Sequence, residues 1–110
     1  PDILDYILSL LVVRNEHTTT EGLRMLRGQI DELDNNLMEL LARRFRVCRE
    51  IGAFKKEHNM TVLQAGRYDE ILQKRGAQAS LCGMDAEFAA HVFELIHEES
   101  VRQQLKIVNE

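Results

Sequence analysis

The 110-residue sequence has no tryptophan, one proline, six glycines and few aromatic residues. Proline and glycine are the residues that most weaken a helix, so their scarcity permits long uninterrupted helices. The plentiful residues, among them leucine, glutamate, arginine, glutamine and alanine, are good helix formers. No segment alternates between apolar and polar residues for long enough to build a sheet. The sequence therefore predicts an all-α fold in a single domain's length of chain.

Metal-binding and disulfide patterns are also missing. The two cysteines, Cys48 and Cys82, match no metal spacing and form no disulfide framework, and the four histidines have no metal-ligand spacing either. Because Cys48 lies on an apolar helical stripe, we expect it to be a reduced thiol in the core. The sequence has no glycine-rich phosphate loop. We therefore expect no metal and no cofactor, and a reducing cytoplasm as the compartment.

The first residues differ from the rest of the chain. The run ILDYILSLLVV (3–13) is apolar but contains Asp5, is too short to span a membrane and lacks the basic leader of a signal peptide. We expect residues 2–13 to form a short amphipathic helix, and RNEHTTTEG (14–22) to be a linker whose threonines cap the next helix. Because the chain starts at Pro1 and not at methionine, we expect a processed or excised piece of a longer polypeptide.

Three further helices are expected, over residues 20–58, 64–78 and from about Asp85 to 108. The first of them would be roughly 57 Å long at about 1.5 Å per residue. A compact domain of this size has a radius of gyration of only about 13 Å, so its own chain cannot wrap such a helix. Its heptad-like apolar stripe is what a partner helix covers. We therefore expect an intertwined homodimer of three-helix subunits.

The stretch LARRFRVCREIGAFKK (41–56) carries six basic residues and one acidic residue in a chain whose net charge is −4. Arg44 occupies a position of the apolar stripe, and Lys55, eleven residues later, falls within about 20° of the same direction, about 16 Å along the axis. An unpaired buried charge is costly, so we expect an anion beside them. Alternatively, both side chains extend past the stripe to water or pair with acids on a neighbouring helix.

The remaining cations of this stretch, Arg43, Arg46, Arg49 and Lys56, point elsewhere and are expected to form a solvated face. In the last helix, Ser100 and Gln104 replace apolar residues along the buried line and, four apart, are neighbours. They are either a hydrogen-bonded core pair or a donor set that faces the same cavity as Arg44 and Lys55.

Arg67 opens a helix N-terminus, where the helix dipole disfavours a cation, and this again suits an anionic ligand. The sequence shows no paired carboxylates and no Ser-His-Asp or Cys-His arrangement. It therefore predicts a site that binds anions and stabilises charge without a nucleophile or a proton shuttle.

These residues carry a family resemblance. The segment LRGQIDELDNNLMELLARRFRVCREIGAFKK, the arginine at 67 and ELIHEESVRQQ together resemble the all-helical chorismate mutases of the AroQ class, over about residues 25–105. The resemblance implies an intertwined helical dimer that converts chorismate to prephenate, a step of aromatic amino-acid biosynthesis in the shikimate pathway, without a cofactor. This would make the protein an isomerase.

The resemblance also implies residue roles. Arg27 would reach into the partner subunit's site and hold one substrate carboxylate, and Arg44 would hold the other. Lys55 and Gln104 would donate to the ether oxygen from opposite helices, and Ser100 would line the carboxylate end of the site.

One part of the family pattern is absent. Arg67 would support the pocket next to Arg44, but many members read Asp-x-x-Arg-Glu here, with acids that help to bind the substrate hydroxyl. This chain has Gln64 and Tyr68 at those two positions, and neither is charged. The resemblance therefore leaves open how the hydroxyl is held.

The resemblance divides the chain into an N-terminal extension, residues 1–24, and a chorismate mutase domain, residues 25–110. A mutase domain with such an extension resembles fusions in which a mutase domain is joined to a 3-deoxy-heptulosonate 7-phosphate synthase.

Three other functions stay open. They are an isochorismate-pyruvate lyase on the same scaffold, a non-catalytic prephenate-sensing regulatory or dimerisation domain of a fused synthase, and a nucleic-acid-binding helix. The last has no aromatic interleaving or recognised motif in its favour. We expect neither nucleic acid nor a membrane as a partner.

Overall fold

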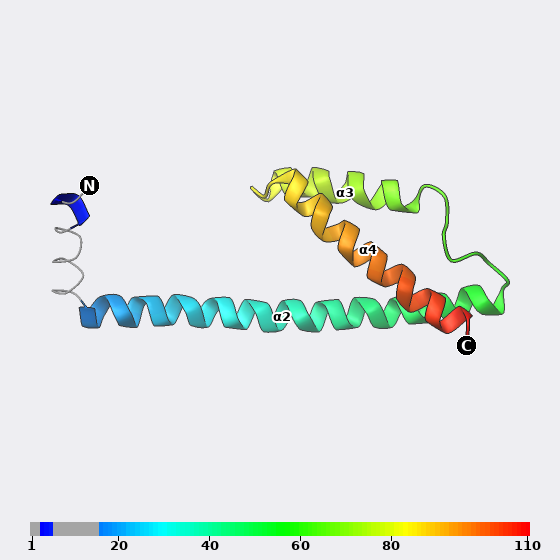
Figure 1. Ribbon diagram of the computed structural model, residues 1–110, viewed down its shortest axis with the longest axis horizontal. Helices are drawn as coiled ribbons and strands as arrows, with labels where there is room; N and C mark the ends of the chain where they lie inside the picture. The colour runs from blue at the N-terminus through cyan, green and yellow to red at the C-terminus, as the bar shows by residue number, and fades with distance from the viewer. Residues whose placement is uncertain (1–2, 6–15) are drawn as a thin grey trace. The chain divides into compact units, whose positions relative to one another are not determined.

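The computed structural model describes residues 3–5 and 16–110 of the chain. Three helices dominate it: α2 (Glu16–Glu57), α3 (Arg67–Leu81) and α4 (Ala86–Val108) (Figure 1). Residues 3–5 are also helical, and the rest of the helix expected over 2–13 lies outside the described residues. No strand occurs in the described ranges, and the predicted all-α class is confirmed. None of the helices described is long and apolar enough to span a membrane.

Helix α2 begins earlier than predicted. Residues 16–22 are helical, so the prediction of a linker there, with threonines that cap the helix, was wrong. Threonine costs a helix only about 0.7 kcal/mol or less per residue relative to alanine, and acidic residues such as Glu21 favour the N-terminal part of a helix. At 42 residues, α2 is about 63 Å long at about 1.5 Å per residue. Gly52 does not interrupt it.

The chain divides into two compact units, 1–40 and 41–110, and α2 contributes to both. In the first unit, the apolar row of α2 is uncovered by any other described residue of that unit. Five large side chains of this row are each at least 55% exposed: Leu26, Ile30, Leu33, Leu37 and Leu40. This unit therefore has no hydrophobic core of its own.

The second unit holds the core, where α3 and α4 pack against each other in opposite directions (Figure 1). Helix α3 begins at Arg67, three residues later than predicted, because Gly66 adopts the left-handed conformation (φ 83°) and stands outside the helix. Asp85 caps α4, and its carboxylate accepts a hydrogen bond from the Phe88 backbone N–H at 2.9 Å. This start of α4 was predicted from the sequence.

Helices α2 and α4 cross at Gly52, where the two backbones come very close. A Cβ atom on Gly52 would lie 3.0 Å from Cα of Gln104 and 3.2 Å from its carbonyl oxygen. The glycine therefore sets how near α4 lies to α2 at Gln104. Buried apolar side chains are few, and Cys48 is one of them, a free thiol as predicted.

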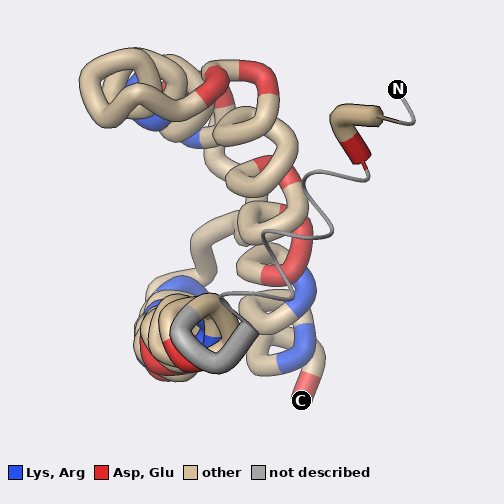
Figure 2. The backbone as a smooth tube through the Cα atoms, turned by 90° about the vertical axis from the view of Figure 1, so that its left-hand side faces the viewer, with Lys and Arg blue, Asp and Glu red and all other residues tan. Residues whose placement is uncertain are grey.

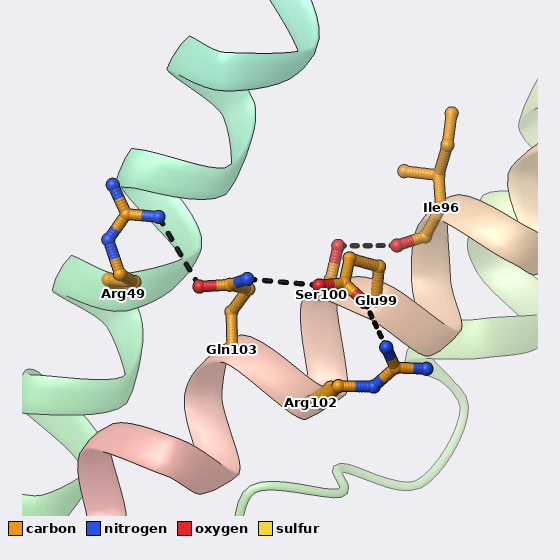
Figure 3. A network of polar contacts seen from close by, with 6 residues as sticks. All are labelled: Arg49, Ile96, Glu99, Ser100, Arg102 and Gln103. Carbon is orange, nitrogen blue, oxygen red and sulfur yellow. Dashed lines mark hydrogen bonds and ion pairs between the residues drawn. The ribbon is translucent and has the colours of Figure 1, made fainter.

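Polar contacts extend this crossing at the surface (Figure 3). Arg49 Nη1 donates to Gln103 Oε1 at 3.3 Å, Gln103 donates to Glu99 at 3.0 Å, and Arg102 pairs with Glu99 at 2.9 Å. Along α4 the acidic residues precede the basic ones near the C-terminus, which suits the helix dipole (Figure 2).

The four cations expected on a solvated face are indeed all exposed: Arg43, Arg46, Arg49 and Lys56.

Candidate active site

The second unit encloses a cavity of about 140 Å³ between α2, α3, α4 and the segment that joins α2 to α3. Seven of the eight predicted site residues line it: Arg44, Lys55, Gln64, Arg67, Tyr68, Ser100 and Gln104. The rest of the lining is mainly apolar: Cys48, Ile51, Val62, Leu63, Ile71, His97 and Val101.

Arg44 lies on α2 and reaches across to α4. Its Nη1 donates to Ser100 Oγ at 2.6 Å, and the Ser100 hydroxyl donates in turn to the backbone carbonyl of Ile96 at 2.8 Å. Ser100 is buried, with only 5% of its surface exposed. A neutral hydroxyl oxygen orients Arg44 without neutralising it, so its positive charge remains available to an anion.

Lys55 makes the second bridge between α2 and α4. Its Nζ donates to Gln104 Oε1 at 2.8 Å and to the backbone carbonyl of Val62 at 2.7 Å. Burial lowers the pKa of the Lys55 ammonium below the usual 10.5, and the neighbouring Cys48 acts weakly in the opposite direction. The ammonium contacts only neutral acceptors among the described residues, and the cavity thus contains a second unneutralised cation.

The start of α3 and the segment before it close the cavity. Arg67 pairs with Glu70 at 2.7 Å, but both side chains are more than half exposed, so this ion pair is weak and its charge is screened. The Gln64 side-chain amide donates to the carbonyl of Thr61 at 2.6 Å. The cavity therefore has one partly neutralised cation at this end and two free cations on α2.

Arg27 is the exception among the predicted residues. It lies on α2 in the first unit, beside Arg24 and Asp31, and it is not among the described residues that line the cavity. The prediction that it serves the site of a partner subunit stays a prediction.

His97 is a cavity residue that the sequence analysis missed. Its ring packs against that of Tyr68, with centroids 4.9 Å apart and planes tilted by 40°. Burial lowers the pKa of the His97 imidazole, and the cations Arg44 and Arg67 lower it further. The sequence did contain a signal for His97, because residues 97, 100 and 104 follow the three-and-four spacing of one helix face.

The charge of the lining defines what the cavity can do. It contains three cations and, among the described residues, no aspartate or glutamate. The described part of the chain also has no group of three or more histidine, cysteine, aspartate or glutamate side chains that could hold a metal. Such a lining binds a small anion and can stabilise negative charge that develops within it. The fold and cavity together define an all-helical protein with a cationic small-molecule site.

Comparison with known proteins gives the family. Residues 26–105 match the model of chorismate mutase type II, so most of the chain lies within that family's domain. The chain is 31% identical over 80 residues to the T-protein of Haemophilus influenzae, which covers 73% of this chain but 21% of that protein. It is 29% identical over 93 residues to the bifunctional chorismate mutase/prephenate dehydratase of Escherichia coli, covering 84% and 24% of the two chains.

A third relative has a size closer to that of this chain. The 4-amino-4-deoxychorismate mutase of Streptomyces venezuelae is 27% identical over 85 residues, which is 77% of this chain and 82% of that protein. The chain thus spans less than a quarter of the first two relatives and most of the third. It belongs to the chorismate mutase type II family, and it is a chorismate mutase domain of the all-helical kind.

Proposed function

We propose that the cavity binds chorismate and converts it to prephenate by an intramolecular [3,3] rearrangement. One C–O bond breaks while one C–C bond forms, and no proton or covalent enzyme intermediate is required. A lining with cations and neutral donors but no base–nucleophile pair fits that demand. The observation that carries the proposal is the facing arrangement of Arg44 with Ser100 and of Lys55 with Gln104 in one cavity.

Each residue has a distinct part in this proposal. Arg44 holds one substrate carboxylate through its planar, bidentate guanidinium, which favours the compact reactive conformer. Lys55 and the amide of Gln104 face the ether oxygen, where negative charge grows as the C–O bond breaks. Ser100 lines the carboxylate end.

Three further residues complete the proposed substrate contacts. Arg67 supports the pocket next to Arg44, and Gln64 and Tyr68 take the positions where other members have acids.

A second copy of the chain completes the proposed site. The exposed apolar row of residues 26–40 would be covered by the partner's helix, and Arg27 of one subunit would hold the second carboxylate in the other subunit's cavity. The proposal thus accounts for a long helix whose first half has no core. It also gives a role to Arg27, which is not among the residues that line the cavity of the second unit.

The domain boundaries and the cellular setting belong to the same proposal. We place residues 1–24 in an extension and 25–110 in the mutase domain, in the cytoplasm. The Escherichia coli relative is named as a fusion with prephenate dehydratase. A fusion of this chain, to such a domain or to a 3-deoxy-heptulosonate 7-phosphate synthase, is part of the proposal.

A second candidate substrate is 4-amino-4-deoxychorismate, because a relative named for it matches most of its own length. Both substrates would undergo the same rearrangement, and they differ in whether the ring carries a hydroxyl or an ammonium group.

The direct test is to add chorismate to the purified protein, follow its disappearance and identify the product. Prephenate supports the proposal. If isochorismate is added instead, formation of salicylate and pyruvate would indicate the lyase. Binding of prephenate without turnover of chorismate would indicate a regulatory domain.

A further inference from the structure

The structure assigns His97 a role in substrate selection: we propose that His97, packed on Tyr68, contacts the ring hydroxyl of the substrate and makes this site select a hydroxyl over an ammonium group. The inference rests on the proposed function and deepens it. It concerns the part of the pocket where the family's acids are absent from this chain.

Position is the first argument. His97 lies on the face of α4 that also carries Ser100 and Gln104, three and seven residues further on. These two residues are buried and contact Arg44 and Lys55 respectively. His97 therefore lies next to side chains that are proposed to bind the substrate, at the end of the cavity that it forms with Tyr68.

The second argument is that several of the other neutral polar groups of the lining already hold a side chain or a backbone carbonyl. Ser100 accepts from Arg44 and donates to Ile96, the amide of Gln64 donates to Thr61, and the oxygen of Gln104 accepts from Lys55. A neutral imidazole offers one donor and one acceptor nitrogen, which is the complement of a hydroxyl group. His97 can therefore serve a hydroxyl without giving up a contact that holds another side chain.

Charge is the third argument. The groups that act on His97 are Arg44 and Lys55 from α2, Arg67 from α3 and Glu98 from its own helix. Burial and, after it, the three cations lower the pKa of the imidazole below its usual 6.5, which favours the neutral form. An uncharged ring hydroxyl can enter these surroundings at little cost in free energy.

An ammonium group on the substrate ring would meet the opposite situation. It would enter a cavity with three cations and no carboxylate among its described lining residues. Like charges at close range repel, and the ammonium would also lose its hydration. The chemistry of the lining thus favours chorismate over 4-amino-4-deoxychorismate.

The test measures kcat/KM for both compounds and takes their ratio. The wild type is expected to prefer chorismate by roughly tenfold or more. His97→Glu places a counter-ion for the ammonium, so the ratio should fall by about tenfold or more. His97→Gln keeps a neutral donor and acceptor and should keep the preference. His97→Leu removes the hydrogen bond and should lower kcat/KM for chorismate roughly two- to tenfold.

His91→Glu is the matched control, because His91 lies on the same helix with its side chain 79% exposed. It adds the same charge away from the cavity and should leave the ratio unchanged. Thermal melts verify that each variant folds. If His97→Glu does not fold, His97→Leu decides, because an unchanged kcat/KM for chorismate in that variant would also overturn the inference. A ratio that His97→Glu leaves unchanged, or a wild type that prefers the amino compound, would overturn the inference.

Failure of the proposed function gives a different result. A folded wild type that converts neither compound would refute the mutase activity itself. Turnover of chorismate with an unchanged ratio in His97→Glu would leave that activity standing and would refute the role of His97 alone.

Discussion

The two halves of α2 follow the same apolar period but put it to different uses. In residues 26–40 the row is apolar and more than half exposed within its unit. In residues 41–57 the row is interrupted by Arg44 and Lys55, and both bond to α4. One half presents surface for burial and the other presents charge to a cavity. The difference teaches that a charged residue within an apolar helical stripe indicates an anion site where its hydrogen-bond partners are neutral.

The largest effect is expected from Lys55→Ala, which removes the cation from the second half of the helix. Loss of one donor to a developing negative charge typically lowers kcat by about 10²–10³. Steady-state assays of chorismate conversion measure it. Lys56→Ala is the matched control, because Lys56 is adjacent and exposed and its Nζ contacts only carbonyls near the C-terminus. Near-normal turnover by Lys55→Ala would contradict its role.

The second prediction joins the two halves across subunits. Arg27→Ala and Arg44→Ala should each lower kcat/KM by about 10², because each removes a charged contact to a carboxylate. After the two variants are unfolded and refolded together, the heterodimer would contain one site with both arginines. Random pairing would then restore roughly a quarter of wild-type activity. A mixture no more active than its parents would argue against shared sites.

The apolar half is tested by Leu37→Asp. A charge in a row that a partner covers should weaken the dimer by at least about 2 kcal/mol per subunit. Sedimentation over a range of concentrations measures the dissociation constant. Asn35→Asp is the control, because it adds the same charge about 160° away around the helix. Equal dissociation constants for the two variants would mean that this row is not the interface.

Much of the fold could be predicted from the sequence. The helical class follows from composition, and the start of α4 near Asp85 was predicted, where the structure shows Asp85 as the cap. The start of α2 could not be predicted, because threonines serve as caps in one context and are tolerated inside a helix in another. The start of α3 depends on the left-handed Gly66, and sequence alone did not indicate which residue would adopt that conformation.

The site could be predicted in part. Arg44 and Lys55 stood out because they interrupt an apolar stripe, and the structure places both in the cavity. His97 could not be predicted in this way, because an imidazole ring is partly apolar and does not interrupt the apolar stripe of a helix. Its neighbours Tyr68 and Arg67 come from another helix, so only the packing of α3 on α4 reveals the cluster.

The contact between the second half of α2 and α4 is tested by Gly52→Ala. The new methyl group would lie 3.0 Å from Cα of Gln104, so the backbones must separate. Overpacking of this kind costs about 1–3 kcal/mol, and it should also pull Gln104 from Lys55 and lower kcat. Gly76→Ala is the control, because its methyl group would meet nothing within 4 Å. It should stabilise α3 by about 0.5–1 kcal/mol, as judged by denaturant unfolding.

The smallest effect concerns pH and separates Lys55 from an ordinary exposed lysine. Since burial lowers its pKa, the active ammonium form is complete at low pH and is lost as pH rises through a value below 10.5. The alkaline limb of kcat/KM should therefore lie below that value.

The alkaline fall of kcat should occur at a higher pH than that of kcat/KM, because a bound dianion raises the pKa of the Lys55 ammonium again. Tyr68 does not account for the limb of kcat/KM, because burial and the nearby Glu94 raise the pKa of its phenol above 10.0. In Lys55→Arg, the guanidinium stays charged to about pH 12, so any activity that remains should show no such limb. A limb that stays in place in Lys55→Arg would assign the titration to another group.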